Sequence, residues 1–302
     1  MQKHAINSIF SFFVFIAEPP EFIEIAPEPS QTAESVLKEI RDNQVGWSND
    51  NSMQYKALKI RRKLYEGSYP NSSVPDENEI RSSVLRYAWK GKIDKLRKYF
   101  EEPKKWQKVN RQDDLGRTAL HYAASWGDTK LIQFLLSIPG INLNIKDCND
   151  MTPLFKAVEI KSLAAVKLLI DGGANPLITL RDGRNIIEYT IMQYGDRCID
   201  ILKYLIGDFG FRYVKQVSDR MTYLHMATLT KRENPIYQTV ELLLEYGSDI
   251  NALEGNGRSP LILAAIADRA DIIYPLLREF ADVKIYDKFL KDAFRYAKEG
   301  SR

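Results

Sequence analysis

Histidine and cysteine are the side chains best suited to catalysis or metal binding near neutral pH, and this chain has few of them. The 302 residues include three histidines, His4, His121 and His225, and two cysteines, Cys148 and Cys198. The sequence contains no H-E-x-x-H zinc motif, no G-x-S-x-G nucleophile motif, no Walker loop and no protein-kinase motif set. Two cysteines without a C-x-x-C pair form no disulfide framework, which favours a reducing compartment. These residues therefore predict no catalytic site, no metal site and no cofactor.

A short pattern around His121 occurs five times between residues 116 and 265. Each copy has a turn-forming residue, then Thr, Asn or Ser, then an apolar pair and a small or apolar helix start. The clearest copy is residues 116–124, GRTALHYAA. The polar anchors are 34, 33, 37 and 37 positions apart, and they are Thr118, Thr152, Asn185, Thr222 and Ser259. Such repetition indicates a stack of similar units that bury their apolar faces against one another.

A period near 33 residues that opens with a T-P-L-H-x-A-like run resembles the ankyrin repeat. The resemblance covers residues 78–302 and implies an all-α solenoid of helix pairs joined by short turn fingers. We expect a C-terminal capping helix over Tyr286–Glu299, and surface insertions where unit four loses its signature and unit five carries extra residues 231–235. The expected units are 78–113, 114–147, 148–180, 181–217, 218–254 and 255–287.

The polar anchor of each unit is expected to cap a helix. A Thr, Asn or Ser side chain there can accept a hydrogen bond from an unpaired backbone N–H, and Pro153 and Pro260 suit the first helical position. In the ankyrin family the histidine of the signature hydrogen-bonds backbone groups between neighbouring units. The resemblance therefore implies structural roles for His121 and His225. Nothing basic is placed to activate Cys198, which we expect to pack in the interior.

The chain before the repeats has a different composition. Residues 1–53 hold 3 Lys or Arg and 8 Asp or Glu, a net charge of −5, and their Pro- and Glu-rich stretch at 18–35 predicts a mostly disordered tail. Residues 54–77 form a basic linker. The net charge is +9 over residues 54–111 and −1 over residues 112–302, so the chain presents an acidic start, a basic middle and a neutral array.

Two segments in this first part leave the localisation open. Residues 5–17 are apolar but too short to span a bilayer, which fits a signal peptide, a hydrophobic docking motif or a spurious extension with Met53 as the true start. The basic cluster in residues 56–63 fits a nuclear-import signal, an acidic-lipid contact, a nucleic-acid patch or a solvated helix. Free cysteines and an ankyrin array favour the cytoplasm, with the nucleus as an alternative. Secretion, which would make Asn71 a glycosylation site, is disfavoured, as are membrane association and direct nucleic-acid binding.

The family resemblance also implies where a partner protein would bind. First helices line the concave side of an ankyrin array, and the corresponding positions here are rich in aromatic and aliphatic residues of the kind found in interface cores. The expected groove residues are Trp89, Tyr122, Trp126, Ile160, Tyr189, Met192, Met226, Leu229 and Leu263. Each could instead pack against neighbouring helices. Four fingers carry an arginine that would suit an acidic or phosphorylated segment, or that is an ordinary solvated turn residue: Arg117, Arg184, Arg220 and Arg258.

These features predict a monomeric, non-enzymatic interaction module, such as a scaffold, adaptor or inhibitor, that grips a partner protein in the concave groove. The alternatives are a nuclear regulator of a transcription or chromatin protein and a secreted or membrane-targeted effector. The first depends on the basic cluster in residues 56–63, and the second depends on the apolar residues 5–17.

Overall fold

The computed structural model describes residues 82–208, 221–230 and 235–300, whose regular secondary structure is entirely helical. The predicted tail, the basic linker and the cluster in residues 56–63 lie outside this part of the chain. The first helices of successive units are α4 (Ser83–Trp89), α6 (Ala119–Trp126), α8 (Pro153–Glu159), α10 (Ile186–Tyr194), α12 (Tyr223–Thr228), α14 (Pro260–Ile266) and α16 (Ala293–Gly300). The second helices are α5 (Ile93–Phe100), α7 (Thr129–Leu136), α9 (Leu163–Asp171), α11 (Ile199–Lys203), α13 (Tyr237–Glu245) and α15 (Ala270–Arg278). Three short non-α turns are η1 (Pro103–Lys108), η2 (Gly195–Cys198) and η3 (Tyr204–Asp208).

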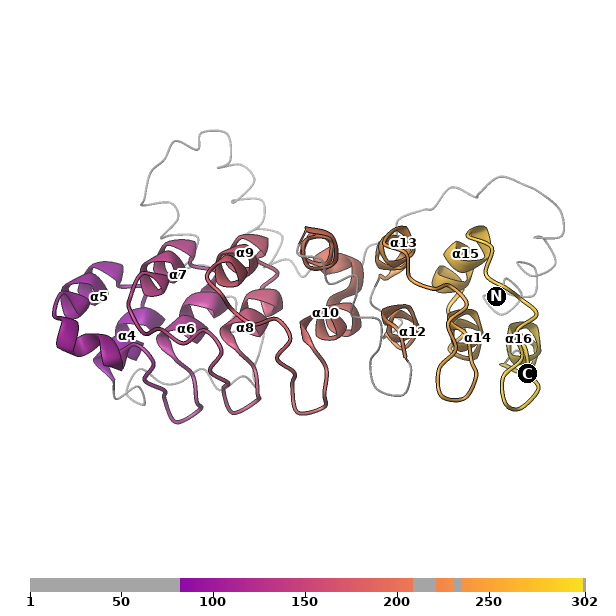
Figure 1. Cartoon of the computed structure of the whole chain (residues 1–302), viewed down its shortest axis with the longest axis horizontal. Coiled ribbons are helices and arrows are strands. Elements are labelled where there is room, and N and C mark those ends of the chain that lie inside the picture. The colour runs from indigo at the N-terminus through magenta and orange to yellow at the C-terminus, as the bar shows by residue number, and fades with distance from the viewer. Residues whose placement is uncertain (1–81, 209–220, 231–234, 301–302) are drawn as a thin grey trace, which may run out of the picture. The chain divides into compact units, whose positions relative to one another are not determined.

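The helices stack in two rows (Figure 1). Neighbouring first helices pack against one another from α4 to α16, and second helices do so from α7 to α15. Hairpin-like fingers project beyond the row of first helices (Figure 1). The predicted all-α solenoid of helix pairs is confirmed.

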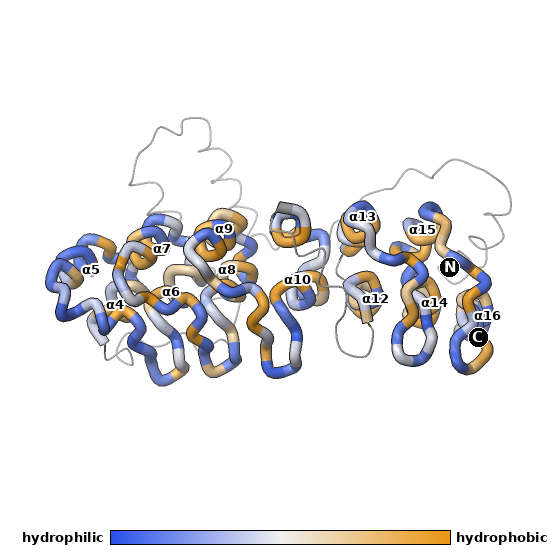
Figure 2. The backbone as a smooth tube through the Cα atoms, viewed as in Figure 1, coloured by the Kyte–Doolittle hydropathy of each residue, from blue (hydrophilic) through white to orange (hydrophobic). Residues whose placement is uncertain are grey.

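Apolar side chains between successive units form the core. The apolar residue two positions after each anchor is at most 1% exposed in five units: Leu120, Leu154, Ile187, Leu224 and Leu261. Three positions further along, small residues such as Ala123 and Ala157 are fully buried, which lets neighbouring first helices approach closely. In Figure 2 the hydrophilic colour follows most of the fingers, while the hydrophobic colour lies mainly on the helices. Each unit is thus stabilised by its neighbours rather than by a core of its own.

The predicted helix caps are confirmed for four of the five anchors. The side chains of Thr118, Asn185, Thr222 and Ser259 each accept a hydrogen bond from the first turn of the following helix. The prediction is wrong for Thr152, whose side chain makes no such bond. Unit three has Phe155 at the position that carries His or Glu in the units with a reciprocal capping box, so the returning side-chain bond is also absent there.

The two units with longer spacing are joined to each other. At the end of α10 the chain turns at Gly195, and the backbone N–H of Asp196 donates to the Pro235 carbonyl over 2.9 Å. The Asp196 carboxylate then accepts hydrogen bonds from the backbone N–H groups of Gln238 (3.0 Å) and Thr239 (2.7 Å). Because these groups belong to the first turn of α13, Asp196 caps a helix of the following unit.

The end of the array differs from the predicted single helix over Tyr286–Glu299. The helix α16 begins only at Ala293, and the residues before it form a further finger. Within that finger the Asp287 carboxylate accepts hydrogen bonds from the backbone N–H groups of Phe289 (2.9 Å) and Lys291 (3.0 Å). Earlier fingers are closed in the same way, so this segment is the first half of a seventh unit.

Candidate protein-binding surface

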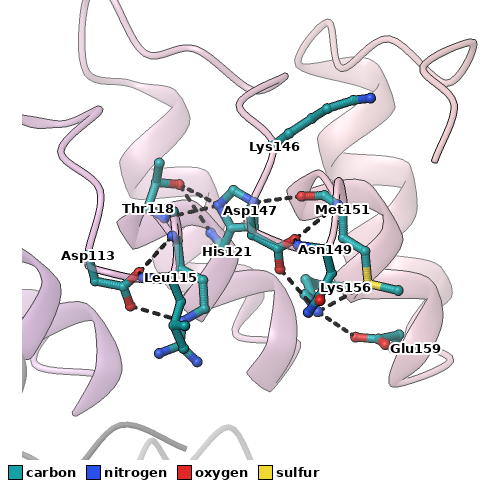
Figure 3. Close-up of polar contacts among 12 residues, drawn as sticks. Asp113, Leu115, Thr118, His121, Lys146, Asp147, Asn149, Met151, Lys156 and Glu159 are labelled. Atoms are coloured by element: carbon teal, nitrogen blue, oxygen red, sulfur yellow. Dashed lines mark hydrogen bonds and ion pairs between the residues drawn. The ribbon is translucent and has the colours of Figure 1, made fainter. Parts of the chain in front are cut away.

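A carboxylate holds each of the best-formed fingers in place. In the finger before α6, Asp113 accepts a hydrogen bond from the backbone N–H of Leu115 over 3.0 Å (Figure 3) and another from the backbone N–H of Arg117 over 2.8 Å. Its second oxygen accepts from the Arg117 guanidinium over 2.9 Å and from the Tyr122 hydroxyl over 2.5 Å. The turn and the first helix that follows are therefore fixed to the same side chain, which leaves little freedom for the residues between them.

The signature histidines connect neighbouring units, as the resemblance implied. His121 accepts a hydrogen bond at Nδ1 from the backbone N–H of Thr118 (3.0 Å), and its Nε2 lies 3.0 Å from the Met151 carbonyl of the next finger (Figure 3). A carbonyl can only accept, so Nε2 carries the proton and the ring is neutral. Burial lowers the pKa of His121 to about 4. His225 repeats the arrangement with the Arg258 carbonyl at 3.1 Å, and burial lowers its pKa as well.

Unit three has a charged side chain, Lys156, at the first-helix position where other units have an apolar or aromatic residue. Lys156 lies 3.4 Å from an oxygen of Asp147 and 3.1 Å from an oxygen of Glu159, and its side chain is only 12% exposed (Figure 3). The same ammonium group lies 3.1 Å from the sulfur of Met151. This part of the first-helix surface is a closed polar network.

The finger arginines do not form the open basic ladder that the sequence predicts. The side chain of Arg117 is 16% exposed and paired with Asp113, while the Nε of Arg184 donates to Asp182 over 2.6 Å. Arg258 faces Asp287 at 3.4 Å and lies over the rings of Phe289 and Tyr296. Arg220 lies outside the described residues. The three described arginines organise their fingers, because carboxylates of the array itself compete for each guanidinium.

Five of the expected groove residues are buried: Tyr122, Trp126, Tyr189, Met226 and Leu263. The expectation that they present outward surface is wrong. Tyr122 turns back to Asp113 and is covered by the Arg117 guanidinium, 5.1 Å from the ring centre. Tyr189 packs edge-on against Phe155, with ring centres 5.3 Å apart, and burial raises the pKa of its phenol. Aromatic side chains at these positions find partners within the array, which sequence spacing does not reveal.

The open apolar surface lies one helical turn further along, in units four to six. Among the expected groove residues, Trp89, Ile160 and Met192 are half-buried, while Leu229 is 48% exposed. Ile266, an outward position of the first helix of unit six, is 43% exposed. Three of these residues each follow their anchor by seven positions, and we call them the apolar row: Met192, Leu229 and Ile266.

Earlier units carry polar residues at the same position. Seven residues after their anchors, units two and three have Ser125 and Glu159, both half-buried. The apolar row is therefore confined to the second half of the array. Beneath it, Tyr189, Met226 and Leu263 form a buried apolar layer. A protruding row on a packed layer is a preorganised contact surface.

Within residues 82–208, 221–230 and 235–300, no group of three or more His, Cys, Asp or Glu side chains is placed to hold a metal ion. Cys198 is buried, and burial raises the pKa of its thiol to about 11, which disfavours the nucleophilic thiolate. None of the helices in these ranges has the length and apolarity needed to cross a membrane.

Comparisons with known proteins agree with the repeat pattern. A family model for ankyrin repeats (3 copies) matches residues 85–182 and 187–287. The human B-cell lymphoma 3 protein is 31% identical over 160 residues, which make up 52% of this chain and 34% of that protein. A putative ankyrin repeat protein of fowlpox virus is 40% identical over 67 residues, 22% of this chain and 10% of that protein. The chain spans little more than a third of the length of the first of these relatives.

Solved structures show the same fold. The ankyrin repeat domain of Bcl-3, described as a unique member of the IkappaB protein family, superposes with a TM-score of 0.61 at 18% identity and covers 72% of this chain and 94% of that domain. The human ASB11 ankyrin repeat domain gives a TM-score of 0.54 at 23% identity, covering 74% of this chain and 98% of that domain. With the family model matching well over half of its residues, this chain belongs to the ankyrin-repeat family, whose members generally act as non-enzymatic modules that bind other proteins.

Proposed function

We propose that this chain is a non-enzymatic interaction module that binds a partner protein through the first helices of units four to six. The observation that carries the proposal is the apolar row, in which Leu229 and Ile266 are nearly half exposed above a buried layer. Exposed apolar side chains at repeated positions are typical of a partner surface. Complete burial of a leucine or isoleucine contributes roughly 1.5–3 kcal/mol, so these two residues can supply much of a specific contact.

The spacing of the row constrains the partner. Neighbouring packed helices lie roughly 8–10 Å apart, which sets the approximate interval between row residues of successive units. An extended strand advances about 10 Å in three residues, and a helix advances about 10.5 Å in seven. The proposed partner segment therefore carries apolar residues about every third position if it is extended, or about every seventh if it is helical.

The test compares partners captured in cells that express this chain. Proximity labelling would be carried out with the wild-type chain, with the double variant Leu229→Asp/Ile266→Asp, and with Leu177→Asp as the matched control. Leu177 is an exposed leucine, at 57%, outside the row. We expect one set of proteins to disappear with the double variant and to persist with the control. Retention of every protein by the double variant would contradict the proposal, provided that circular dichroism shows unchanged helicity.

A second candidate is a regulator that acts in the nucleus, which the basic cluster in residues 56–63 favours. Clustered basic residues interleaved with Leu58, Ile60 and Leu64 fit an import signal. Deletion of residues 56–63 from a fluorescently tagged chain is expected to reduce its nuclear signal. An unchanged nuclear signal would remove this candidate without affecting the first.

A further inference from the structure

The first unit carries a concentration of positive charge that the rest of the array lacks. Residues 86–111 contain ten Lys or Arg and three Asp or Glu, a net charge of +7, whereas residues 112–302 have a net charge of −1. In Figure 2 the hydrophilic colour covers much of α5, the second helix of this unit. Charges of one sign that gather on one unit repel one another and disfavour the compact state. The stability of the array therefore does not explain this concentration.

Most of this charge is not neutralised within the array. In later units, carboxylates hold many basic side chains, as Asp147 holds Lys156 at 3.4 Å. In the first unit, the ion pairs between described residues all involve Glu102, which lies 3.1 Å from Lys104 and 2.6 Å from Lys105. Five other cations of this unit, four exposed and one half-buried, pair with no carboxylate of the described residues. We call them the basic end: Lys95, Arg97, Lys98, Lys108 and Arg111.

The turn after α5 is fixed beside that helix. The indole N–H of Trp106, in η1, donates to the Phe100 carbonyl at the end of α5 over 2.9 Å. Lys108 is the last residue of η1, and the backbone N–H of Arg111 donates to its carbonyl over 3.2 Å. Because η1 packs against α5, the cations of the turn and those of the helix belong to one surface at the end of the array.

The aromatic and apolar side chains of this unit are not open to a ligand. Lys105 lies over the ring of Tyr99 at 4.9 Å, and Arg97 lies over the Phe134 ring of the next unit at 5.0 Å. Binding of single-stranded nucleic acids relies on aromatic faces on which bases stack. No large apolar side chain within residues 82–111 is exposed, so none is placed to enter a lipid layer. The unit offers positive charge without the groups that single strands and membranes use.

Exposed carboxylates divide the positive surface. Asp94 and Glu101 are both exposed, next to the lysines of α5. A nucleic acid or an anionic bilayer carries negative charge continuously and would face these carboxylates as well as the cations. A protein segment can place Asp or Glu opposite the cations and neutral residues opposite Asp94 and Glu101, which avoids contacts between like charges. The charge pattern therefore fits an acidic protein segment best.

We propose that the basic end binds an acidic segment of a partner protein, at a site separate from the apolar row. Lys95 and Lys98 are three residues apart in α5 and so share a face that two acidic side chains can contact together. Each exposed ion pair is weak, so several must form at once, and rising salt concentration weakens the contact. The basic end lies in unit one and the apolar row in units four to six, so the two proposals share no residue.

The test is fluorescence anisotropy with the full chain and a labelled dodecapeptide of alternating Glu and Ser. A dodecapeptide of alternating Gln and Ser controls for uncharged contacts. The variant Lys95→Gln/Lys98→Gln/Lys108→Gln removes three charges from the basic end, and we expect it to weaken binding of the Glu peptide by about tenfold. A matched control removes three exposed lysines of later units and should change the affinity by less than about twofold: Lys167→Gln/Lys203→Gln/Lys284→Gln. Circular dichroism checks that both variants keep their helicity.

Three results would overturn this inference. Equal losses of affinity in the two variants would mean that the peptide responds to net charge alone. Absent binding of the Glu peptide, or equal binding of the Gln peptide, would mean that the basic end does not recognise acidic side chains. Binding of a DNA duplex or of phosphatidylserine vesicles that is tighter than that of the Glu peptide, and is lost in the first variant, would assign the basic end to a nucleic acid or a membrane. None of these results bears on the apolar row.

Discussion

His121 links two units of the array through one uncharged ring. Its two nitrogens are occupied by Thr118 of its own unit and by the Met151 carbonyl of the next. This role could be predicted because the family signature fixes both the residue and its register. The behaviour of Tyr122, its neighbour, could not, because the short bond from its hydroxyl to Asp113 depends on how the finger folds back.

The buried His121 makes stability dependent on pH. Its pKa is lowered from 6.5 to about 4 when folded, so only the unfolded chain binds a proton there between these values. The contribution is complete above pH 6.5 and is lost as the pH falls toward 4, by ~3 kcal/mol in total. The variant His121→Gln lacks this pH-dependent contribution to the free energy of unfolding. We expect urea denaturation at a series of pH values to show the stability difference between wild type and variant shrinking by that amount from pH 7 to pH 4. A difference that stays constant would contradict the neutral, buried histidine.

The spacing of the repeats does not predict how units four and five are joined. The longer repeats predicted insertions, but not that the turn after α10 would cap the second helix of the next unit through Asp196. That contact spans 43 positions of sequence and depends on the turn at Gly195, whose φ is positive.

The sequence did not predict the seventh finger, for another reason. The spacing of Phe289, Ala293 and Tyr296 imitates one helical face, while the turn-closing role of Asp287 has no periodic pattern.

Substitution of Gly195 tests this junction. An added β-carbon there would lie 2.3 Å from the Pro235 carbonyl oxygen, a backbone atom that cannot move without displacing the start of α13. We expect Gly195→Ala to reduce the free energy of unfolding by about 3 kcal/mol or more. Gly247→Ala is the matched control, because its φ is also positive while nothing lies within 4 Å, and it should cost only about 1–2 kcal/mol. Equal losses in chemical denaturation would show that the close contact is unimportant.

At the scale of the whole array, stability resides between units. The sequence predicted this because each anchor is followed by an apolar residue that a single helix pair cannot bury. It predicted the open surface less well. The choice between core and surface for Tyr122, Tyr189 and Met226 depends on side-chain direction and on neighbours in adjacent units, and neither is encoded in the repeat spacing.

A pair of leucine variants measures the coupling between units. Leu154 is 1% exposed, so Leu154→Ala is expected to cost about 2–5 kcal/mol in chemical denaturation. Leu177 is 57% exposed, and Leu177→Ala should change the free energy of unfolding by less than about 0.5 kcal/mol. Similar values for the two variants would be inconsistent with a core formed between units.

The most direct test of the binding account is the affinity of the apolar row for a partner recovered by proximity labelling. The dissociation constant would be measured by titration for the wild type, for Leu229→Asp/Ile266→Asp and for Leu177→Asp. We predict that the double variant weakens binding by at least about 30-fold, as expected for two central contact residues, and that Leu177→Asp changes it by less than about threefold. Equal effects of the two variants, or no effect of either, would contradict a binding surface on the first helices of units four to six.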